Sequence, residues 1–124
     1  MKMILENSDA AAYWITNYAP GRISINGQVI ETSVIVTPDR LLCDWSPGHF
    51  EDLDRTHMDP IIELAPDVVL LGTGQRQHFP SRDIMLSLLE RDIGLEVMDT
   101  HSACRTYNIL THEGRRVVAA LIIG

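Results

Sequence analysis

The alternation of apolar and polar residues predicts that the first third of the chain is built from strands. Residues 22–25 and 28–31 alternate on either side of Asn26-Gly27, a dipeptide that readily takes the positive φ angles of a hairpin turn. The β-branched run over 33–37 predicts another strand, which Pro38 ends. Two further short strands are predicted over 13–16 and 41–45.

The second part of the chain changes to alternating strands and helices. Asp59 and Pro60 predict the N-cap and first position of a short helix. The continuous apolar runs over 67–71 and 117–123 are typical of strands that are buried on both faces, and a short strand is predicted over 95–98. A helix that opens at 80–83 is expected to bury four apolar side chains on one face: Ile84, Met85, Leu88 and Leu89. The next helix, over 100–112, is expected to pack on Ala103, Cys104, Tyr107 and Leu110.

These elements predict one α/β domain over residues 1–124. Its 124 residues fit a single core. The short strand–helix–strand connections of the second part imply right-handed parallel crossovers. We therefore expect a three-layer fold with a central mixed, mostly parallel sheet, covering helices, and an N-terminal β-hairpin region.

The composition narrows the classes of partner. The net charge of −7 argues against nucleic-acid binding and suits a basic partner surface. The two cysteines fit a reducing compartment, and no apolar run is long enough to cross a bilayer. The N-terminus does not read as a targeting segment. These features predict a cytoplasmic protein without membrane insertion.

Two predicted strand ends carry the candidate ligand site. In an open α/β sheet, ligands bind beyond the carboxyl ends of the strands. One strand ends in Gly72, Thr73, Gly74 and Gln75. The backbone amides of a glycine-rich turn such as this can line an anion-binding site. The other ends in Asp99 and Thr100 at a helix start, and Arg105 follows on the second turn. A tight turn, a helix cap and a structural ion pair are the alternative roles of these three groups.

Other candidate chemistry is weaker. Cys104 lies near a helix N-terminus, which favours a nucleophile, but also on the apolar stripe, which favours core packing. His101 and Cys104 have ligand-like spacing but make only half of a zinc site, and Asp99 has no partner for general base catalysis. No catalytic residue, metal or cofactor is therefore predicted. Four aromatic residues are candidates either to close the core or to contact a partner: Trp14, Trp45, Phe50 and Phe79.

Three motifs together resemble a known family: Ser33-Val-Ile-Val, Leu70-Leu-Gly-Thr-Gly, and residues 98–110 followed by Glu113-Gly-Arg-Arg-Val. The likeness is to a widespread family of small domains of uncharacterised biochemistry. Its eukaryotic members include an assembly factor of mitochondrial respiratory complex I and an adipogenesis-associated protein. The resemblance implies a three-layer α/β fold and supplies no catalytic residues. It places these residues in the family pattern: Gly72, Thr73, Gly74, Thr100, Cys104, Arg105, Thr106, Tyr107 and Asn108. With no targeting extension, the chain resembles a bacterial relative.

Two functions follow as expectations. The first is a non-enzymatic binding or assembly-helper protein with a protein partner, because no complete catalytic constellation is present. The second is a protein or enzyme that binds a small anionic ligand at Gly72–Gln75 and Asp99–Thr100.

Overall fold

The structure is a computed structural model that describes residues 4–6 and 12–124. The elements run in the following order: β1 (Ile4–Glu6), β2 (Ile15–Ala19), β3 (Arg22–Ile25), β4 (Gln28–Ile30), β5 (Val34–Val36), β6 (Arg40–Leu42), the 3₁₀ helices η1 (Phe50–Asp52) and η2 (Arg55–Met58), α1 (Asp59–Glu63), β7 (Val68–Gly72), α2 (Arg82–Leu89), β8 (Gly94–Met98), α3 (Thr100–His112) and β9 (Val117–Leu121).

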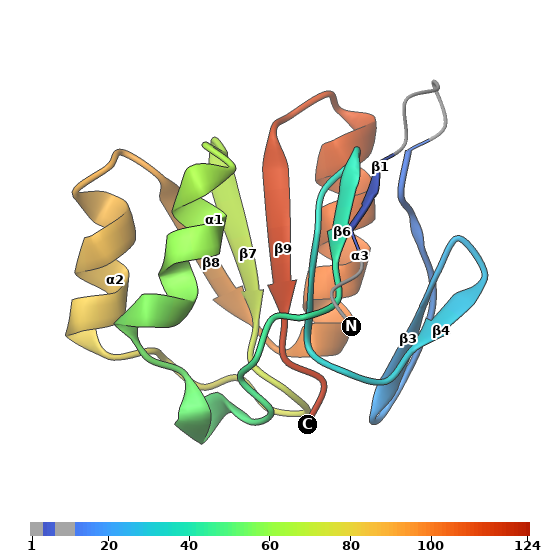
Figure 1. Cartoon of the computed structure of the whole chain (residues 1–124), viewed down its shortest axis with the longest axis horizontal. Coiled ribbons are helices and arrows are strands. Elements are labelled where there is room, and N and C mark those ends of the chain that lie inside the picture. The colour runs from blue at the N-terminus through green and yellow to red at the C-terminus, as the bar shows by residue number, and fades with distance from the viewer. Residues whose placement is uncertain (1–3, 7–11) are drawn as a thin grey trace.

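A six-stranded mixed sheet forms the centre of the molecule, in the order β1-β6-β5-β9-β7-β8 (Figure 1). The strands β9, β7 and β8 are parallel, as the short crossovers predict. The pairs β1–β6, β5–β6 and β5–β9 are antiparallel. Parallel pairing is thus confined to three strands, which is less than the mostly parallel sheet expected from the sequence. The difference arises because β9 pairs back onto the N-terminal half through β5.

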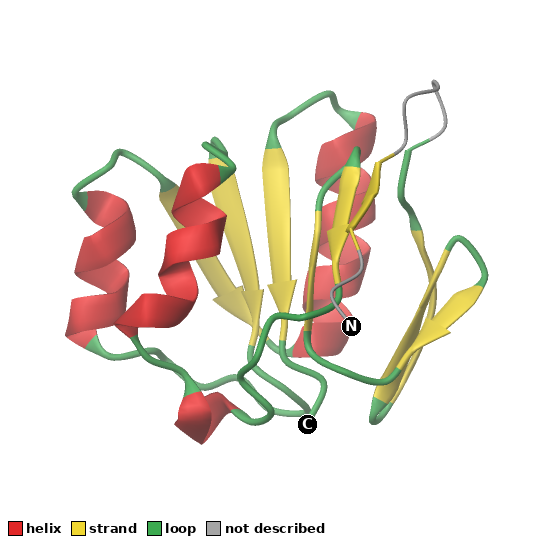
Figure 2. Cartoon of the chain, in the orientation of Figure 1, coloured by secondary structure: helices red, strands yellow, loops and turns green. Residues whose placement is uncertain are grey.

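Each face of this sheet carries its own apolar core, and the molecule therefore has three layers (Figure 2). Val69 and Leu71 point to the face that is covered by α1 and α2. Val68 and Leu70, which alternate with them, point to the opposite face, which is covered by α3 and the N-terminal hairpin. This alternation on a strand with no exposed residue explains why its sequence is continuously apolar.

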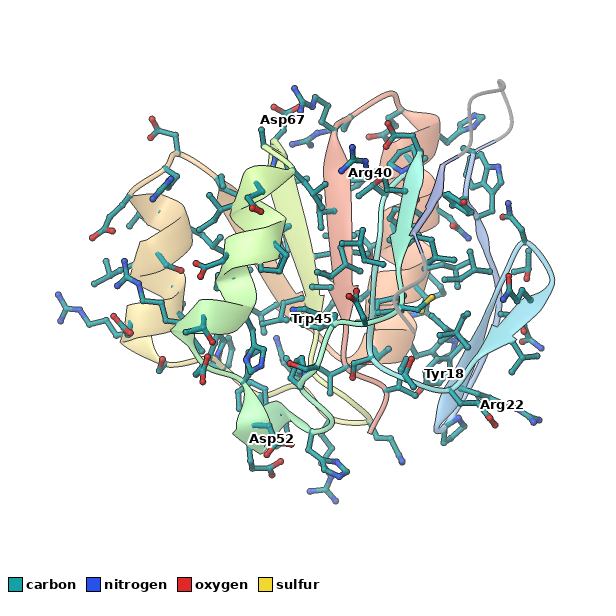
Figure 3. All side chains as sticks on the ribbon, viewed as in Figure 1. Tyr18, Arg22, Arg40, Trp45, Asp52 and Asp67 are labelled. Atoms are coloured by element: carbon teal, nitrogen blue, oxygen red, sulfur yellow. The ribbon has the colours of Figure 1, made fainter. Side chains whose placement is uncertain are left out.

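The N-terminal hairpin belongs to a second sheet, of order β2-β3-β4. Its turn residues Asn26 and Gly27 have φ angles of 50° and 84°, as the Asn-Gly prediction requires. Ile23 and Ile25 are each 1% exposed and pack into the core shared with α3. In Figure 3, Tyr18 and Arg22 mark this sheet at the lower right of the view, whereas Asp67, just before β7, lies near the top.

Side-chain caps fix where two helices of the second part begin. The Ser81 side chain accepts a hydrogen bond from the Ile84 amide at the start of α2, and Asp99 caps α3 in the same way. The first helix differs from the prediction, because Asp59 is its first residue and not its N-cap. The side-chain cap lies instead at the start of the preceding 3₁₀ helix, η2. There the Asp54 side chain accepts a hydrogen bond from the Thr56 amide.

The helix α2 buries less of its apolar surface than its sequence predicts. Ile84 and Leu88 are buried, but Met85 is 39% exposed and Leu89 is 66% exposed. The prediction that these four side chains share a buried face is therefore wrong. The reason lies in the sheet order, because α2 lies over β8, the last strand, and only part of its apolar arc meets the sheet.

In the described part of the chain, every helix is too short or too polar to cross a membrane.

Candidate functional site

The structure brings the two predicted strand ends together. The strands β7 and β8 are neighbours, and Gly72 pairs with Met98 at their carboxyl ends. The Thr73 amide donates to the Met98 carbonyl at 3.0 Å. The Thr100 amide at the start of α3 donates to the Gly74 carbonyl at 2.8 Å. Six of the seven candidate residues, Gly72–Gln75 with Asp99 and Thr100, thus share one end of the sheet.

The amides of Thr73, Gly74 and Thr100 at this junction all donate within the protein. The Gly74 amide donates to Thr100 Oγ1 at 2.8 Å, and Thr100 Oγ1 donates onward to the Ile122 carbonyl at 2.7 Å. Thr73 and Thr100 are 2% and 1% exposed. The sequence predicts that backbone amides of the Gly72–Gln75 turn would bind an anion. The amides of Thr73, Gly74 and Thr100 converge on protein oxygens instead.

Close packing explains both glycines of the Gly-Thr-Gly turn. A Cβ at Gly72 would stand 2.9 Å from Thr100 Oγ1 and 3.0 Å from Thr100 Cα. Gly74 has a φ of 104°, and a Cβ there would stand 2.9 Å from the Gly124 carbonyl oxygen. The chain therefore needs both glycines where β7, α3 and the end of β9 meet, independently of any ligand.

Asp99 has a complete set of local partners. Its Oδ1 accepts from the Ser102 amide at 2.9 Å, and its Oδ2 accepts from the Ser102 hydroxyl at 3.0 Å. The Ser102 backbone hydrogen bond is the main cause that holds the Asp99 pKa below its ordinary value. A carboxylate that stays ionised and capped is suited to start a helix and poorly suited to accept a proton.

Arg105 lies apart from this junction. It is exposed and lines a hollow of about 200 Å³ between α3 and β2, together with Tyr18 and Asn108. The structure therefore does not place Arg105 in the predicted crevice, because its turn of α3 faces the small sheet. His101 is also found here, and its ring stacks on that of Tyr18 with the centroids 4.7 Å apart.

Cys104 has the properties of a core residue. It is 3% exposed, and burial is the main cause that raises the pKa of its thiol to about 12. A thiol with this pKa is almost entirely protonated at neutral pH, which disfavours a nucleophile. Among the described residues, no group of three or more His, Cys, Asp or Glu side chains is arranged to hold a metal ion.

Two other residues of the same motif hold the small sheet in place. The Tyr107 hydroxyl donates to the Tyr13 carbonyl at 3.0 Å. The Asn108 side chain accepts from the Ile15 amide at 3.0 Å and donates to the Ile15 carbonyl at 2.8 Å. The amide group of Asn108 thus occupies the edge of β2 as a neighbouring strand would. These long-range contacts give the motif a structural role that the sequence alone did not reveal.

The structure also assembles Ser46, His57 and Asp54 in the manner of a hydrolase triad, although their spacing gives no signal in the sequence. His57 Nε2 lies 3.1 Å from Ser46 Oγ. Its Nδ1 accepts the Asp54 backbone amide at 3.0 Å, and these partners assign the ring proton to Nε2. A general base needs a free Nε2 beside the serine. This arrangement therefore joins two loops and does not activate Ser46.

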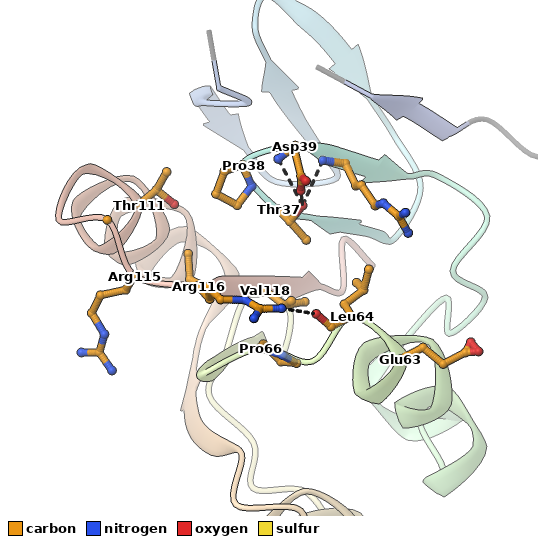
Figure 4. Close-up of a pocket in the computed structure, with 13 residues that line it drawn as sticks. Thr37, Pro38, Asp39, Glu63, Leu64, Pro66, Thr111, Arg115, Arg116 and Val118 are labelled. Atoms are coloured by element: carbon orange, nitrogen blue, oxygen red, sulfur yellow. Dashed lines mark hydrogen bonds between the residues drawn. The ribbon is translucent and has the colours of Figure 1, made fainter. Parts of the chain in front are cut away.

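A larger cavity lies at the opposite end of the sheet, where β7 and β9 begin (Figure 4). It has a volume of about 610 Å³, and its charged lining residues are Asp39, Arg40, Glu63, Arg115 and Arg116. Arg116 is engaged with the protein, because its guanidinium donates to the Leu64 carbonyl at 3.2 Å. The sequence did not predict this cavity, whose walls come from three separate turns.

Comparison with known proteins places this fold among characterised structures. A structure from Bordetella parapertussis is 36% identical to this chain, with a TM-score of 0.87. The match covers 93% of this chain and 98% of the Bordetella chain. The Xanthomonas campestris protein XCC1710 is 41% identical and covers 95% of this chain and 91% of its own, with a TM-score of 0.84.

Curated relatives carry a functional name. The zebrafish (Danio rerio) protein "NADH dehydrogenase [ubiquinone] 1 alpha subcomplex assembly factor 3" is 33% identical over 96% of this chain. Its human counterpart is 31% identical over the same share of the chain. The chain spans 69% of the zebrafish protein and 65% of the human one. Residues 15–122 match the family described as "Protein of unknown function (DUF498/DUF598)". The chain therefore belongs to this family of unknown function.

Proposed function

We propose that this protein is a non-enzymatic binding protein that assists the assembly of a protein complex. The observation that carries the proposal is an exposed apolar surface on α2 and the loop before it. We call Phe79, Met85 and Leu89 the α2 surface. Their side chains are 73%, 39% and 66% exposed. Three of the five large apolar side chains that are exposed in the described structure thus lie within one short segment.

The neighbours of α2 explain which flank the α2 surface occupies. Asp83 and Glu90 share one side of the helix, where both pair with Arg55 of η2. At 100° per residue, Met85 falls on the flank that faces away from η2. That flank borders β8, the outermost strand of the sheet. Exposed apolar side chains that gather beside a sheet edge are typical of a protein-interaction surface.

The name of the curated relatives supports the same function. They are called assembly factors, a class of protein that acts by contacting other proteins. The alternative function, the binding of a small anionic ligand at Gly72–Gln75 and Asp99–Thr100, is less favoured. Three of the backbone amides that such a ligand could use, those of Thr73, Gly74 and Thr100, already have protein partners.

Affinity purification with quantitative mass spectrometry tests the proposal. The tagged chain, expressed in the cells that carry its gene, is compared with the double variant Met85→Asp/Leu89→Asp. We expect the double variant to lose one defined set of co-purified proteins by at least about tenfold, the loss expected when anchors worth about 1.4 kcal/mol are removed.

The matched control is Ile109→Asp, because Ile109 is 59% exposed on α3, on the other face of the sheet. It should retain that set of proteins. A co-purified set that is unchanged in the double variant, or lost equally in the control, would contradict a role of the α2 surface in protein binding.

A further inference from the structure

We propose that the open edge of β8 receives an extended segment of the partner in which apolar residues alternate with lysine or arginine. This inference rests on the proposed function and adds the way in which the partner binds. Recognition of this kind uses backbone hydrogen bonds for affinity and alternate side chains for specificity.

The backbone of β8 presents unpaired groups along its outer side. The Gly94 amide donates to the Asp67 carbonyl, and the Met98 carbonyl accepts from Thr73, so both residues turn toward β7. In a parallel ladder, successive residues turn to opposite sides. Leu95 and Val97 therefore direct their amides and carbonyls outward, where the described part of the chain places no further strand. This edge has the form of a strand acceptor.

A side chain covers part of this edge. Gln77 Nε2 donates to the Val97 carbonyl at 2.9 Å, which confirms that this carbonyl points away from β7. Gln77 is exposed, and its loop continues to Phe79 of the α2 surface. A backbone amide of an incoming strand would replace the Gln77 side-chain amide as the donor to this carbonyl. The exchange costs little free energy, because one amide donor replaces another.

The two faces of β8 specify different side chains in the segment. Leu95 packs into the core beneath α2, and Val97 shares its face two residues later. The residues of an added strand on this face would meet the flank of α2 that carries Met85, which favours apolar side chains. Glu96 is exposed on the opposite face and favours a lysine or arginine directly across from it. The net charge of −7 favours the same sign of partner.

The same charge disfavours a second copy of this chain as the occupant. In an antiparallel pairing of two β8 strands centred on Glu96, the two Glu96 carboxylates would stand directly opposite each other. Like charges at such positions destabilise a strand pair. Together with the net charge of −7, this repulsion favours a segment of a different protein.

NMR of the ¹⁵N-labelled protein with synthetic peptides tests this inference. The probes are end-blocked peptides of alternating valine and lysine, alternating valine and glutamate, and valine and lysine in scrambled order. At millimolar concentration, we expect only the first to shift the amides of Leu95 and Val97 and the side-chain amide of Gln77. In Glu96→Lys, the peptide with glutamate should become the preferred one. The change should be about three- to tenfold in the ratio of affinities, as expected when an opposite-charge pair becomes a like-charge pair.

Glu31→Lys is the matched control, because it makes the same change of net charge at an exposed position beside β4. It should leave the preference at β8 unchanged. Equal shifts from all three peptides, no shift at Gly94–Met98, or a switch of preference in Glu31→Lys would overturn the inference. Shifts of the β8 amides that depend on protein concentration without peptide would instead assign the edge to a second copy.

These results separate the two proposals. If Met85→Asp/Leu89→Asp loses its co-purified proteins but no peptide shifts β8, the protein-binding function stands and the strand-pairing mode fails. If the double variant loses nothing, the function itself fails.

Discussion

At the scale of single residues, most of the family motif in this chain performs a structural role. Thr100 joins three segments through one hydroxyl, since it accepts from Gly74 and donates to Ile122. Cys104 fills the core, and Asn108 binds both backbone groups of Ile15. The residues of this family motif therefore connect segments that are distant in the sequence.

Thr100→Val should destabilise the protein although it preserves the shape of the side chain. The variant leaves the buried Gly74 amide and Ile122 carbonyl without their partner, and we expect a loss of about 2 to 4 kcal/mol in the free energy of unfolding. Urea denaturation should show a lower midpoint with an unchanged slope. Thr100→Ser, which keeps the hydroxyl, should recover most of the loss; equal stability of Val and wild type would refute the role of the hydroxyl.

The capping role of Asp99 should depend on pH. Its folded-state pKa is lowered by the hydrogen bonds from Ser102, so its stabilising effect is present above the unfolded pKa and is lost as pH falls through the folded pKa. Asp99→Ala should cost about 1 kcal/mol at pH 7, and the difference from wild type should shrink below about pH 4.

The control for this prediction is Asp99→Asn, which retains an N-cap without the charge. It should cost less than Asp99→Ala at pH 7, because asparagine also caps helices well. Thermal unfolding of the three proteins between neutral and acid pH measures both effects. A loss in Asp99→Ala that is constant over this range would show that the carboxylate charge does not contribute.

At the scale of elements, the small sheet is attached to the rest of the molecule through α3. Asn108→Ala should remove two hydrogen bonds to Ile15 and destabilise the protein by about 2 kcal/mol. Hydrogen exchange should show the amides of β2 and β3 becoming less protected while those of β7 and β9 stay protected. Uniform loss of protection in both sheets would instead show that they unfold as one unit.

Arg105→Ala provides the control on the same helix. Arg105 is exposed and lines the hollow beside Asn108. Its replacement should change stability by less than about 0.5 kcal/mol, as is usual for an exposed position.

Most of the longer elements were predicted from the sequence, whereas β1, η1 and η2 were not, and the surroundings of the elements were predicted less well. The residues of β7, α3 and the hairpin turn follow from local patterns, because apolar runs, caps and Asn-Gly act over a few residues. The exposure of Met85 and Leu89 was not predictable, because it depends on β8 being the last strand of the sheet. Likewise, the Thr100 hydroxyl donates to the Ile122 carbonyl, and the proximity of these two residues follows from strand order and not from periodicity.

At the scale of the whole molecule, the two cysteines differ in how far the folded structure must open before a thiol reagent can reach them. Cys43 is half-buried, whereas Cys104 lies in the core between the sheet and α3. The raised thiol pKa of about 12 at Cys104 adds to its protection, because the thiolate is the reactive form. A thiol reagent at pH 8 should therefore modify Cys43 in the folded protein and Cys104 only after denaturation.

Mass spectrometry of the modified protein identifies which cysteine reacts, and Cys43→Ser should leave no thiol that reacts in the folded state. Rapid modification of Cys104 in the folded protein would contradict its place in the core and would reopen a catalytic role for it.

The hydrogen bond from Gln77 to the Val97 carbonyl has a consequence for solubility. A bare strand edge beside apolar side chains is a starting point for cross-β stacking, in which copies of one chain add to each other without limit. Gln77 and Glu96 obstruct this growth, the first by shielding a carbonyl and the second by like-charge repulsion between copies. Under the proposed strand pairing, these two side chains would favour a different protein over further copies of this chain at the β8 edge.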